Sequence, residues 1–473
     1  MSKQYKFLVG GEWRSSDEKV YIANPYNGSA VGVLSLAHEE DVDEGIQYAV
    51  NAFSELRSLS GYERSKILAR IAHSLEKRRE EFAEMISNES GKPIRFSSAE
   101  VDRAISTFQL AAEESTRIGG EVLPLDVTST VKNRKGIVTR FPIGVIACIS
   151  PFNFPLNLIA HKIAPAIASG NSFIIKPPPQ APLTSLLLGD CLLDSGLPKS
   201  AVNILPCANE IAEMLVTDSR IAMVSFTGSA AVGWELKQKA GKKKIALELG
   251  GNAAVIVDKH ADVGLAVERC VLGAFAYAGQ VCIKVQRIYV HKSVYKQFEM
   301  KFLEATSEVK VGNPLENNTI VGPMISLAEA ERVEKWVKEA VADGANIAWG
   351  GKRRGSMIEP TVLDGVKPSM RVCSEEIFGP VATLHKVDSI ENAVEEVNDS
   401  RYGLQTGIFS SELSSIMYAY KHLDVGGVIA NDYPTFRVDT MPYGGIKDSG
   451  FGREGVRYAI QEMTEPKLLV LEF

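Results

Sequence analysis

Residues 145–258 alternate between short apolar runs and helical stretches, and this rhythm limits the possible fold more than any other feature of the sequence. The apolar runs are Val145–Ser150, Ser172–Lys176, Val202–Leu205, Met223–Phe226, Ile245–Leu249 and Ala254–Val257. The helical stretches between them are Asn157–Ala168, Leu183–Leu193, Glu210–Val216 and Ala230–Ala240. Continuously apolar strands separated by helices indicate a parallel sheet that is covered on both faces. We therefore predict an α/β fold.

A parallel sheet also predicts where a ligand binds, because ligands occupy the crevice at the carboxyl ends of its strands. The loops of interest should follow Ser150, Lys176, Phe226 and Leu249. A second α/β rhythm runs from about residue 250 to 448, with helices predicted at Val263–Tyr277, Lys296–Val309 and Leu327–Asp343. Residues 63–90 carry an apolar stripe at helical spacing, which predicts one long amphipathic helix that ends at Gly91.

Composition and charge narrow the class of function. The 473 residues carry a formal net charge of −6 without a long block of one sign, so we expect no nucleic-acid partner. The start of the chain shows no apolar secretion signal, and prolines and charges interrupt the most apolar stretch, so we expect no membrane span. Six scattered cysteines without a CxxC pair are typical of reduced thiols in a cytoplasmic protein, and we expect no metal site.

Two reactive side chains lie next to glycines. Cys282 ends the segment AGQVC, where a loop could expose the thiol and lower its pKa, although by itself the position fits a buried structural cysteine better. Glu248 lies in an apolar run just before a Gly-Gly turn. Burial would raise the pKa of Glu248 toward the range of a general base, and the alternative is a carboxylate paired with a lysine or arginine.

Two further segments could offer hydrogen-bond donors to a ligand. Asn153 lies in the stiff segment PFNFP, where its amide could stabilise an oxyanion or satisfy its own turn. Residues 226–233 place glycines between a strand and a helix, a layout that directs backbone N–H groups at a phosphate. A G-x-G-x-x-G match at residues 450–455 follows no predicted strand, so we interpret it as a chance match.

Together these segments resemble the aldehyde dehydrogenase superfamily over nearly the whole chain. The matching motifs, in the family's order and spacing, are PFNFP (151–155), FTGS (226–229), LELGG (247–251), AGQVC (278–282), EEIFGP (375–380) and PYGGIKDSGFGREG (442–455). The resemblance implies a three-part α/β fold. It consists of a Rossmann-like NAD(P)-binding domain (1–121 and 141–248), an α/β catalytic domain (249–448) and a small β oligomerisation flap (122–140 and 449–473). The flap would join subunits into a homodimer or homotetramer.

The resemblance also implies roles for single residues. Cys282 matches the nucleophile and Glu248 the base, and Asn153 matches the side chain of the oxyanion hole. The cofactor, NADP or NAD, would be bound by Lys176, Ser229, Gly228, Gly233, Phe152, Glu376 and Phe378. The implied reaction is attack of the thiolate on an aldehyde, hydride transfer to the nicotinamide, and hydrolysis of the thioester by water that the base activates.

Departures from the family pattern bear on cofactor and substrate. Many NAD-preferring members have a glutamate at the position of Pro179, so its absence predicts dual or NADP-leaning use. Arg103, His161 and Arg437 match positions that bind the anionic tail of small aldehydes in some relatives, and they could clamp an anion or form structural salt bridges. The pattern is most similar to the lactaldehyde/glyceraldehyde and non-phosphorylating glyceraldehyde-3-phosphate dehydrogenase branches. We therefore expect a small hydroxylated or anionic aldehyde as substrate.

Two other functions have to be weighed. A CoA-acylating semialdehyde dehydrogenase commonly lacks the base at the position of Glu248, and a non-catalytic structural descendant would be expected to lose the thiol or the base. Both groups are present here, which favours an enzyme that hydrolyses its thioester.

Overall fold

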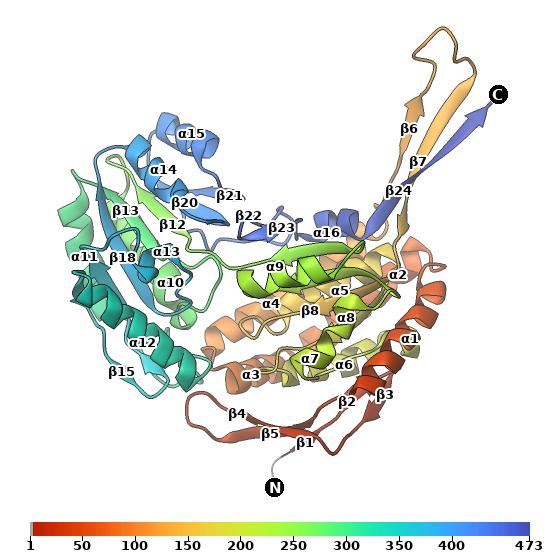
Figure 1. The fold of residues 1–473 in the computed structure, drawn as a ribbon, viewed down its shortest axis with the longest axis horizontal. Helices are drawn as coiled ribbons and strands as arrows, with labels where there is room; N and C mark the ends of the chain where they lie inside the picture. Colours follow the sequence, from red (N-terminus) through yellow and green to blue (C-terminus); the bar gives the residue numbers. More distant parts are fainter. Residues whose placement is uncertain (1–2) are drawn as a thin grey trace.

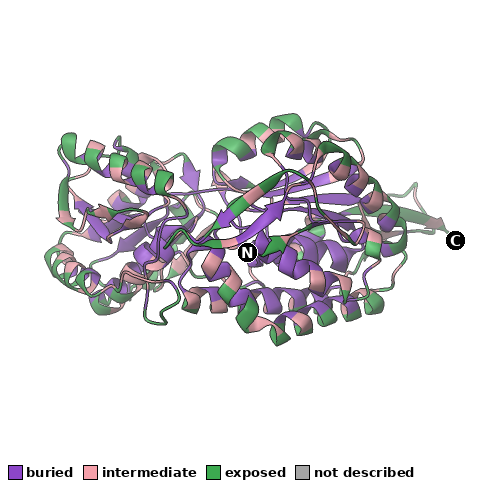
Figure 2. Ribbon diagram, turned by 90° about the horizontal axis from the view of Figure 1, so that it is seen from below, coloured by how far each residue is buried: buried purple, intermediate pink, exposed green. Residues whose placement is uncertain are grey.

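The computed structural model describes residues 3–473, so the first two residues of the predicted cofactor segment 1–121 lie outside the described residues. The chain forms two α/β lobes that lie side by side, and a narrow arm projects from one of them (Figure 1). The strands of both lobes are largely buried, whereas the outer helices have an exposed face (Figure 2). This is the α/β architecture that the alternation of strands and helices predicted.

The first lobe is built on a five-stranded sheet with the order β23-β11-β10-β8-β9. Its parallel strands are β8 (Val145–Ile149), β9 (Ser172–Lys176), β10 (Ile221–Thr227) and β11 (Lys244–Glu248), and the antiparallel edge strand is β23 (Gly450–Phe451). The direction of strand addition reverses at β8, which has β9 on one side and β10 on the other. Such a switch point is where an open α/β sheet forms a crevice for a ligand.

Helices cover both faces of this sheet. Ile146 and Cys148 of β8 pack into a core with α2 to α5, whereas Val145 and Ala147 pack into a second core with α1 and α9. The helices of this lobe are α1 (Glu39–Leu56), α2 (Gly61–Lys77), α3 (Arg79–Ser90), α4 (Ile94–Glu114), α5 (Asn157–Ser169), α6 (Leu183–Leu193), η1 (Lys199–Ala201), α7 (Asn209–Ala212), α8 (Met214–Thr217), α9 (Ala230–Lys239) and α16 (Val456–Glu462). Small accessory sheets at the start of the chain are formed by β1 (Gln4–Tyr5), β2 (Phe7–Val9), β3 (Glu12–Arg14), β4 (Lys19–Ala23) and β5 (Ala30–Ser35).

The single helix predicted at 63–90 is wrong, because the structure has two helices, α2 and α3. Arg78 separates them with a non-helical backbone (φ −107°, ψ 19°). Its guanidinium pairs with Glu81 on α3 at 2.8 Å and with Asp190 on α6 at 3.3 Å, so the break allows α3 to pack against α6. A break of one residue leaves the apolar stripe nearly intact, which is why the periodicity did not reveal it. The predicted end at Gly91 is confirmed by its left-handed φ of 71°.

The second lobe contains a seven-stranded sheet with the order β14-β17-β18-β13-β12-β20-β21. These strands are β12 (Ala254–Val257), β13 (Arg287–His291), β14 (Asn346–Trp349), β17 (Thr361–Asp364), β18 (Val381–Val387), β20 (Gln405–Phe409) and β21 (Gly427–Ala430). The helices are α10 (Val263–Phe275), η2 (Ala276–Gly279), α11 (Tyr295–Ser307), α12 (Leu327–Ala342), α13 (Arg371–Ser374), α14 (Ile390–Asn398) and α15 (Leu413–His422). Two short antiparallel pairs are β15 (Arg353–Arg354) with β16 (Met357–Ile358) and β19 (Tyr402–Gly403) with β22 (Ile446–Lys447).

Two of the predicted strands differ in the structure. The strand at 254–257 is confirmed as β12, but it belongs to the sheet of the second lobe. Residues 202–205 are buried but form no strand, since only isolated bridges join Ile204 to Leu8 and Ile175. Burial and extended backbone were predicted correctly there, but an apolar run does not show whether a neighbouring strand is long enough to continue a ladder.

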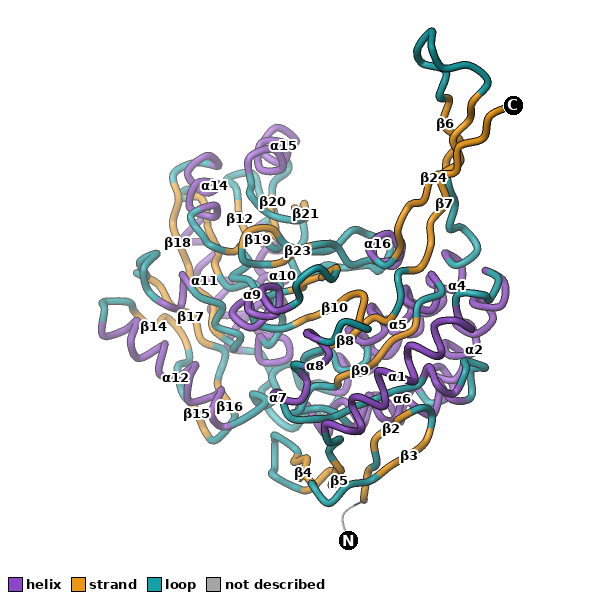
Figure 3. Tube along the Cα trace, turned by 45° about the vertical axis from the view of Figure 1, so that its right-hand side comes forward, coloured by secondary structure: helices purple, strands orange, loops and turns teal. Residues whose placement is uncertain are grey.

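The projecting arm is a three-stranded antiparallel sheet of β6 (Glu121–Pro124), β7 (Arg134–Pro142) and β24 (Thr464–Glu472). Its strands run together in both views of the chain (Figures 1 and 3). Of the segment 449–473 that the sequence assigned to the flap, only residues from Thr464 onward lie in the arm, because β23 and α16 pack on the first lobe. No helix among the described residues combines the length and the apolar character needed to cross a bilayer.

Candidate active site

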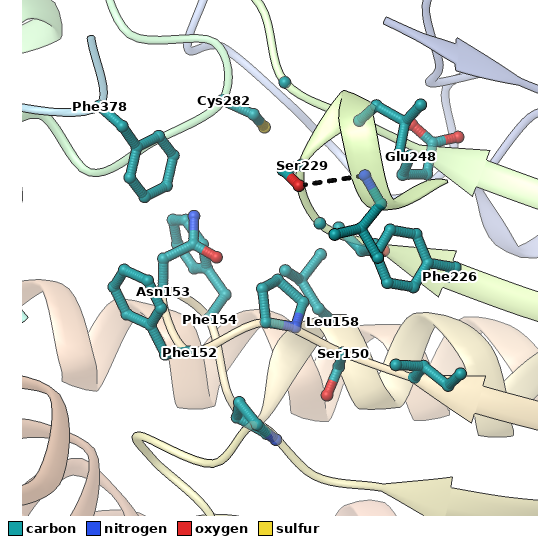
Figure 4. A pocket seen from close by; sticks show the side chains of 18 of the residues that line it. Ser150, Phe152, Asn153, Phe154, Leu158, Phe226, Ser229, Glu248, Cys282 and Phe378 are labelled. Atoms are coloured by element: carbon teal, nitrogen blue, oxygen red, sulfur yellow. Dashed lines mark hydrogen bonds between the residues drawn. The ribbon is translucent and has the colours of Figure 1, made fainter. Parts of the chain in front are cut away.

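A cavity of about 990 Å³ lies where the first lobe meets the second. Its wall on the first lobe includes residues after β8, β9, β10 and β11, which are the four loops that the sequence predicted. Its wall on the second lobe includes Cys282 and Glu376. Figure 4 shows Asn153, Cys282 and Phe378 around this cavity, so residues far apart in the sequence meet in one site.

Cys282 lies on a loop with an unusual backbone. Residues 277–279 adopt positive φ values in succession (54°, 53° and 66°), and this left-handed conformation is costly for residues other than glycine. The buried side chain of Gln280 holds the loop, because its amide donates to the Pro323 carbonyl and its oxygen accepts from the Ile325 N–H. The loop is therefore fixed so that Cys282 faces the cavity.

The Cys282 thiol is accessible, but it ionises with difficulty. It is partly exposed, whereas the other five cysteines are buried. Burial raises the pKa of the thiol to about 11, and the charge of Glu376 adds to that shift. Two effects oppose this rise and lower the pKa of the thiol. They are the contact of 3.1 Å with the Tyr443 hydroxyl and the positive charge of Arg437. A nucleophilic role for Cys282 therefore depends on the groups around the sulfur.

Glu248 ends strand β11 and is buried without a hydrogen-bond partner for either carboxyl oxygen. Burial raises the pKa of Glu248 well above its usual range, and the charge of Glu454 raises it further. A Cβ on Gly444 would come within 3.0 Å of its Oε1, so glycine leaves this carboxyl group its space. A buried carboxyl group with a raised pKa and free oxygens has the properties of a general base.

The Asn153 side chain bridges the two lobes at the cavity. Its Nδ2 donates to the Gln280 carbonyl at 3.0 Å, while its buried Oδ1 has no hydrogen-bond partner. The segment that follows is anchored by Glu100, whose Oε1 accepts from the N–H groups of Leu156 and Asn157. The amide of Asn153 is thus held beside the Cys282 loop.

Two buried charges support this arrangement from behind. The Lys92 ammonium lies 2.5 Å from the Glu100 carboxylate and 3.5 Å from the centre of the Phe154 ring. Burial lowers the pKa of Lys92 to about 8. The ion pair and the cation–π contact fix the turn next to Asn153, and sequence reasoning did not identify either of these charged residues.

One end of the cavity carries donors suited to phosphate and ribose groups. Lys176 ends β9, and its Nζ lies 3.2 Å from Asn209 Oδ1. Ser229 caps the N-terminus of α9 by accepting a hydrogen bond from the Val232 N–H (Figure 4). Gly228 donates its N–H to the Glu248 carbonyl, and Gly233 lies against Leu249 so closely that a Cβ would collide with it. Of the four predicted residues at this end, Lys176 ends β9, Gly228 and Ser229 connect β10 to α9, and Gly233 lies on α9.

The other end of the cavity combines an acid with two aromatic rings. Glu376 accepts a hydrogen bond from the Gly251 N–H at 3.2 Å, and a Cβ on Gly250 would collide with its carboxyl group. Phe378 has a positive φ of 44°, and its ring packs edge-on against Phe152 with 6.0 Å between the centroids. Figure 4 shows both rings beside Asn153.

The three residues predicted to clamp an anion lie around the carboxylate of Asp439, which is 3.9 Å from the Nε of Arg437. Arg103 donates to its carboxylate at 2.7 Å, and His161 Nε2 lies 3.0 Å from the same oxygen. Arg437 donates to Glu454 at 3.0 Å. Both arginines line the cavity, whereas His161 is fully buried and does not form part of the wall. Their direct contact with a substrate therefore stays a prediction, and the imidazole lies behind the arginines.

Sequence reasoning missed three residues of this site. Tyr443 and Glu454 belong to the quoted motif PYGGIKDSGFGREG, but no role was assigned to either residue. Asp439 follows Arg437 by two residues, and this spacing was the available signal. A carboxylate near a predicted anion-binding arginine is a candidate partner that holds the guanidinium in place.

Comparison with known proteins gives a consistent result. The chain matches the aldehyde dehydrogenase family over residues 13–469. It is 45% identical to the 3-sulfolactaldehyde dehydrogenase of Priestia megaterium, over 99% of this chain and 98% of that relative.

Two solved structures resemble the whole molecule. Aldehyde dehydrogenase 21 from Physcomitrella patens, in complex with the reaction product succinate, has a TM-score of 0.98 at 45% identity and covers 100% of this chain and 99% of its own. Glyceraldehyde-3-phosphate dehydrogenase GapN from Methanocaldococcus jannaschii, complexed with NADP, has a TM-score of 0.93 at 38% identity. The match covers 97% of this chain and 100% of that chain.

Proposed function

This chain belongs to the aldehyde dehydrogenase family, and on that premise we propose that it oxidises a small aldehyde with an anionic tail to the carboxylic acid through a thioester on Cys282. One observation carries the choice of substrate. The guanidinium of Arg437 lies 3.8 Å from the centre of the Tyr443 ring, whose hydroxyl lies 3.1 Å from the Cys282 sulfur. A fixed cation this close to the nucleophile favours an aldehyde whose anionic group is only a few bonds from its carbonyl.

The charge balance around Arg437 supports an anionic tail. Although burial opposes the shift, Lys162 and Arg437 lower the pKa of Glu454 to about 2. The pKa of Asp439 is likewise held below its usual range, against burial, by His161 and Arg103. The cations Lys162, Arg437 and Arg103 thus face the carboxylates of Glu454 and Asp439, and the excess positive charge favours a carboxylate, sulfonate or phosphate on the substrate. Succinate and 3-sulfolactaldehyde, which appear in the names of two relatives, carry such groups.

Each of three side chains in the site has its own role in the proposed reaction. The Cys282 thiolate attacks the aldehyde carbon, and the carbonyl oxygen becomes an oxyanion that the Asn153 amide stabilises by exchanging its bond to Gln280. NAD(P), when bound, would supply the hydride acceptor for this site, and the cysteine would then carry the acyl group as a thioester. Glu248 then takes a proton from water, which hydrolyses the thioester and frees the acid.

The cavity has the features that an NAD(P) cofactor requires. Lys176 and the N-terminus of α9 at Ser229 suit the ribose and the pyrophosphate, and Glu376 and Phe378 suit the nicotinamide end. Burial raises the pKa of Glu376 to about 7, and its bond from the Gly251 N–H opposes that shift. Pro179 lines the wall close to Lys176 and carries no charge that would repel a 2′-phosphate. We therefore infer that NADP binds at least as well as NAD.

Initial rates with a matched pair of aldehydes test the proposed substrate class. Lactaldehyde and 3-sulfolactaldehyde differ by a sulfonate, and we expect kcat/KM to favour the sulfonated aldehyde by about 10- to 100-fold, the size of one charge-assisted hydrogen bond. Succinate semialdehyde and an aliphatic aldehyde form a second pair. Arg103→Met should reduce the preference without abolishing turnover, whereas Cys282→Ala should abolish turnover. Highest rates with the neutral aldehydes would exclude the anionic tail, and turnover in Cys282→Ala would exclude the thioester.

A further inference from the structure

Tyr443 contacts the nucleophile, but no step of the proposed reaction uses its side chain. Its hydroxyl lies 3.1 Å from the Cys282 sulfur, and its side chain is 3% exposed. Its backbone is fixed to Glu454 by two hydrogen bonds, of 3.0 Å from its N–H and 2.7 Å to its carbonyl. The phenol is therefore held against the sulfur by a paired backbone.

We propose that Tyr443 is a catalytic residue whose hydroxyl donates a hydrogen bond to Cys282 and stabilises the attacking thiolate; this role rests on the proposed function. In the thiol form either group can be the donor. Once the thiol has lost its proton to solvent, the sulfur can only accept, so the phenol has to donate. A hydrogen bond to a charged acceptor is about twice as strong as a neutral one, so the contact favours the thiolate.

The charged groups around Cys282 make such a donor necessary. Glu248 at the end of β11 and Glu376 after α13 both disfavour the thiolate, as burial does. Arg437 favours the thiolate, but this guanidinium already pairs with Glu454. Of the effects that lower the pKa of the thiol, the hydrogen bond with Tyr443 is the largest.

Arg437 also acts on the phenol itself. Its guanidinium carbon lies 3.8 Å from the centre of the Tyr443 ring, within the range of a cation–π contact. A cation over the ring withdraws electron density from the hydroxyl, which makes the O–H a stronger donor. The guanidinium therefore acts on the nucleophile through the ring, in addition to its proposed contact with the substrate tail.

The ionisation of Cys282 can be measured without an aldehyde or a cofactor. The rate of alkylation by iodoacetamide follows the thiolate, and Cys282→Ala supplies the background of the other cysteines. Tyr443→Phe keeps the ring and its packing but removes the hydroxyl. We expect the pH midpoint of alkylation to rise by about one unit, which lowers the rate at neutral pH about tenfold. An unchanged midpoint in Tyr443→Phe would overturn the proposal.

A double-mutant cycle tests the path through the ring. Arg437→Met should raise the midpoint in the native background, and by less in the Tyr443→Phe background, because the hydroxyl that it strengthens is then missing. Equal shifts in both backgrounds would overturn the contribution of the cation–π contact. Circular dichroism and NADP binding check that each variant is folded. Because no aldehyde is present, failure of the proposed substrate class leaves this result unaffected.

Discussion

Glu248 and Glu454 are two buried carboxyl groups whose surroundings give them opposite protonation behaviour. Lys162 and Arg437 overcome burial and hold Glu454 ionised, and that charge in turn raises the pKa of Glu248. Like charges that cannot both ionise separate the roles of two neighbouring acids. Glu454 is thus a fixed anion that positions Arg437, and Glu248 is the group free to exchange a proton.

Replacement of Glu248 by glutamine should separate acylation from hydrolysis. The base form of Glu248 is lost as the pH falls through its raised pKa, which lies above the ordinary value of about 4.3. Hydrolysis should therefore decline already at mildly acidic pH. In Glu248→Gln it should be about 10²- to 10⁴-fold slower at pH values where Glu248 is ionised, and the decline at acidic pH should disappear. Because acylation does not need the base, rapid mixing of Glu248→Gln should show a burst of one reduced cofactor per site. Hydroxylamine cleaves a thioester without a general base, so its addition should restore turnover. A variant with no burst and an unchanged acid limb would remove Glu248 from the hydrolytic step.

Single residues were predictable where their neighbours in the chain revealed them. Cys282 and Glu248 drew attention because each lies next to glycines or within an apolar run, and the structure brings both to the cavity. Tyr443 could not be found in this way, because its significance depends on a sulfur 161 positions away. The contact of Asp439 with Arg103 spans 336 positions, and no local pattern encodes that distance.

At the scale of elements, the parallel sheet was the most productive prediction. Continuous apolar runs identified β8 to β11, and the rule that ligands bind at the carboxyl ends of such strands located four of the loops that line the cavity. Helix boundaries were predicted less accurately, because the turn at Arg78 depends on an ion pair with another helix. Partners supplied by distant parts of the chain set these details, and periodicity contains no information about them.

The loop after β9 allows a test of cofactor choice with one substitution. Pro179→Glu places a carboxylate on the cavity wall next to Lys176, where it should repel a 2′-phosphate and accept hydrogen bonds from a 2′-hydroxyl. We expect the Kd of NADP to rise on the order of tenfold, about 1.4 kcal/mol, with little change for NAD. Calorimetry without an aldehyde measures both constants, and Pro179→Gln is the uncharged control. Equal weakening of both cofactors by the two variants would contradict an electrostatic cause.

At the scale of the whole molecule, the arm is hard to explain for an isolated chain. It projects from the first lobe (Figure 1), and its strand β24 lies at the edge of a three-stranded sheet. Large apolar side chains are exposed along it, namely Val122, Leu468, Leu469, Val470 and Phe473. An exposed apolar edge strand is a template for pairing with another chain. We therefore propose that the arm joins copies of this chain into a dimer or tetramer.

A charge placed on the arm should disrupt that assembly without damaging either lobe. Leu469 is 55% exposed and lies outside the hydrophobic cores, so Leu469→Asp should leave the free energy of unfolding of each lobe almost unchanged. If β24 packs against a second copy, a buried unpaired carboxylate would cost several kcal/mol at the interface and shift the assembly to smaller species. Analytical ultracentrifugation measures the masses, and Lys467→Asp on the same strand controls for added negative charge. The same assembly mass for Leu469→Asp and the native chain would show that subunits meet through another surface, because an edge strand cannot bury an aspartate in place of a leucine at no cost.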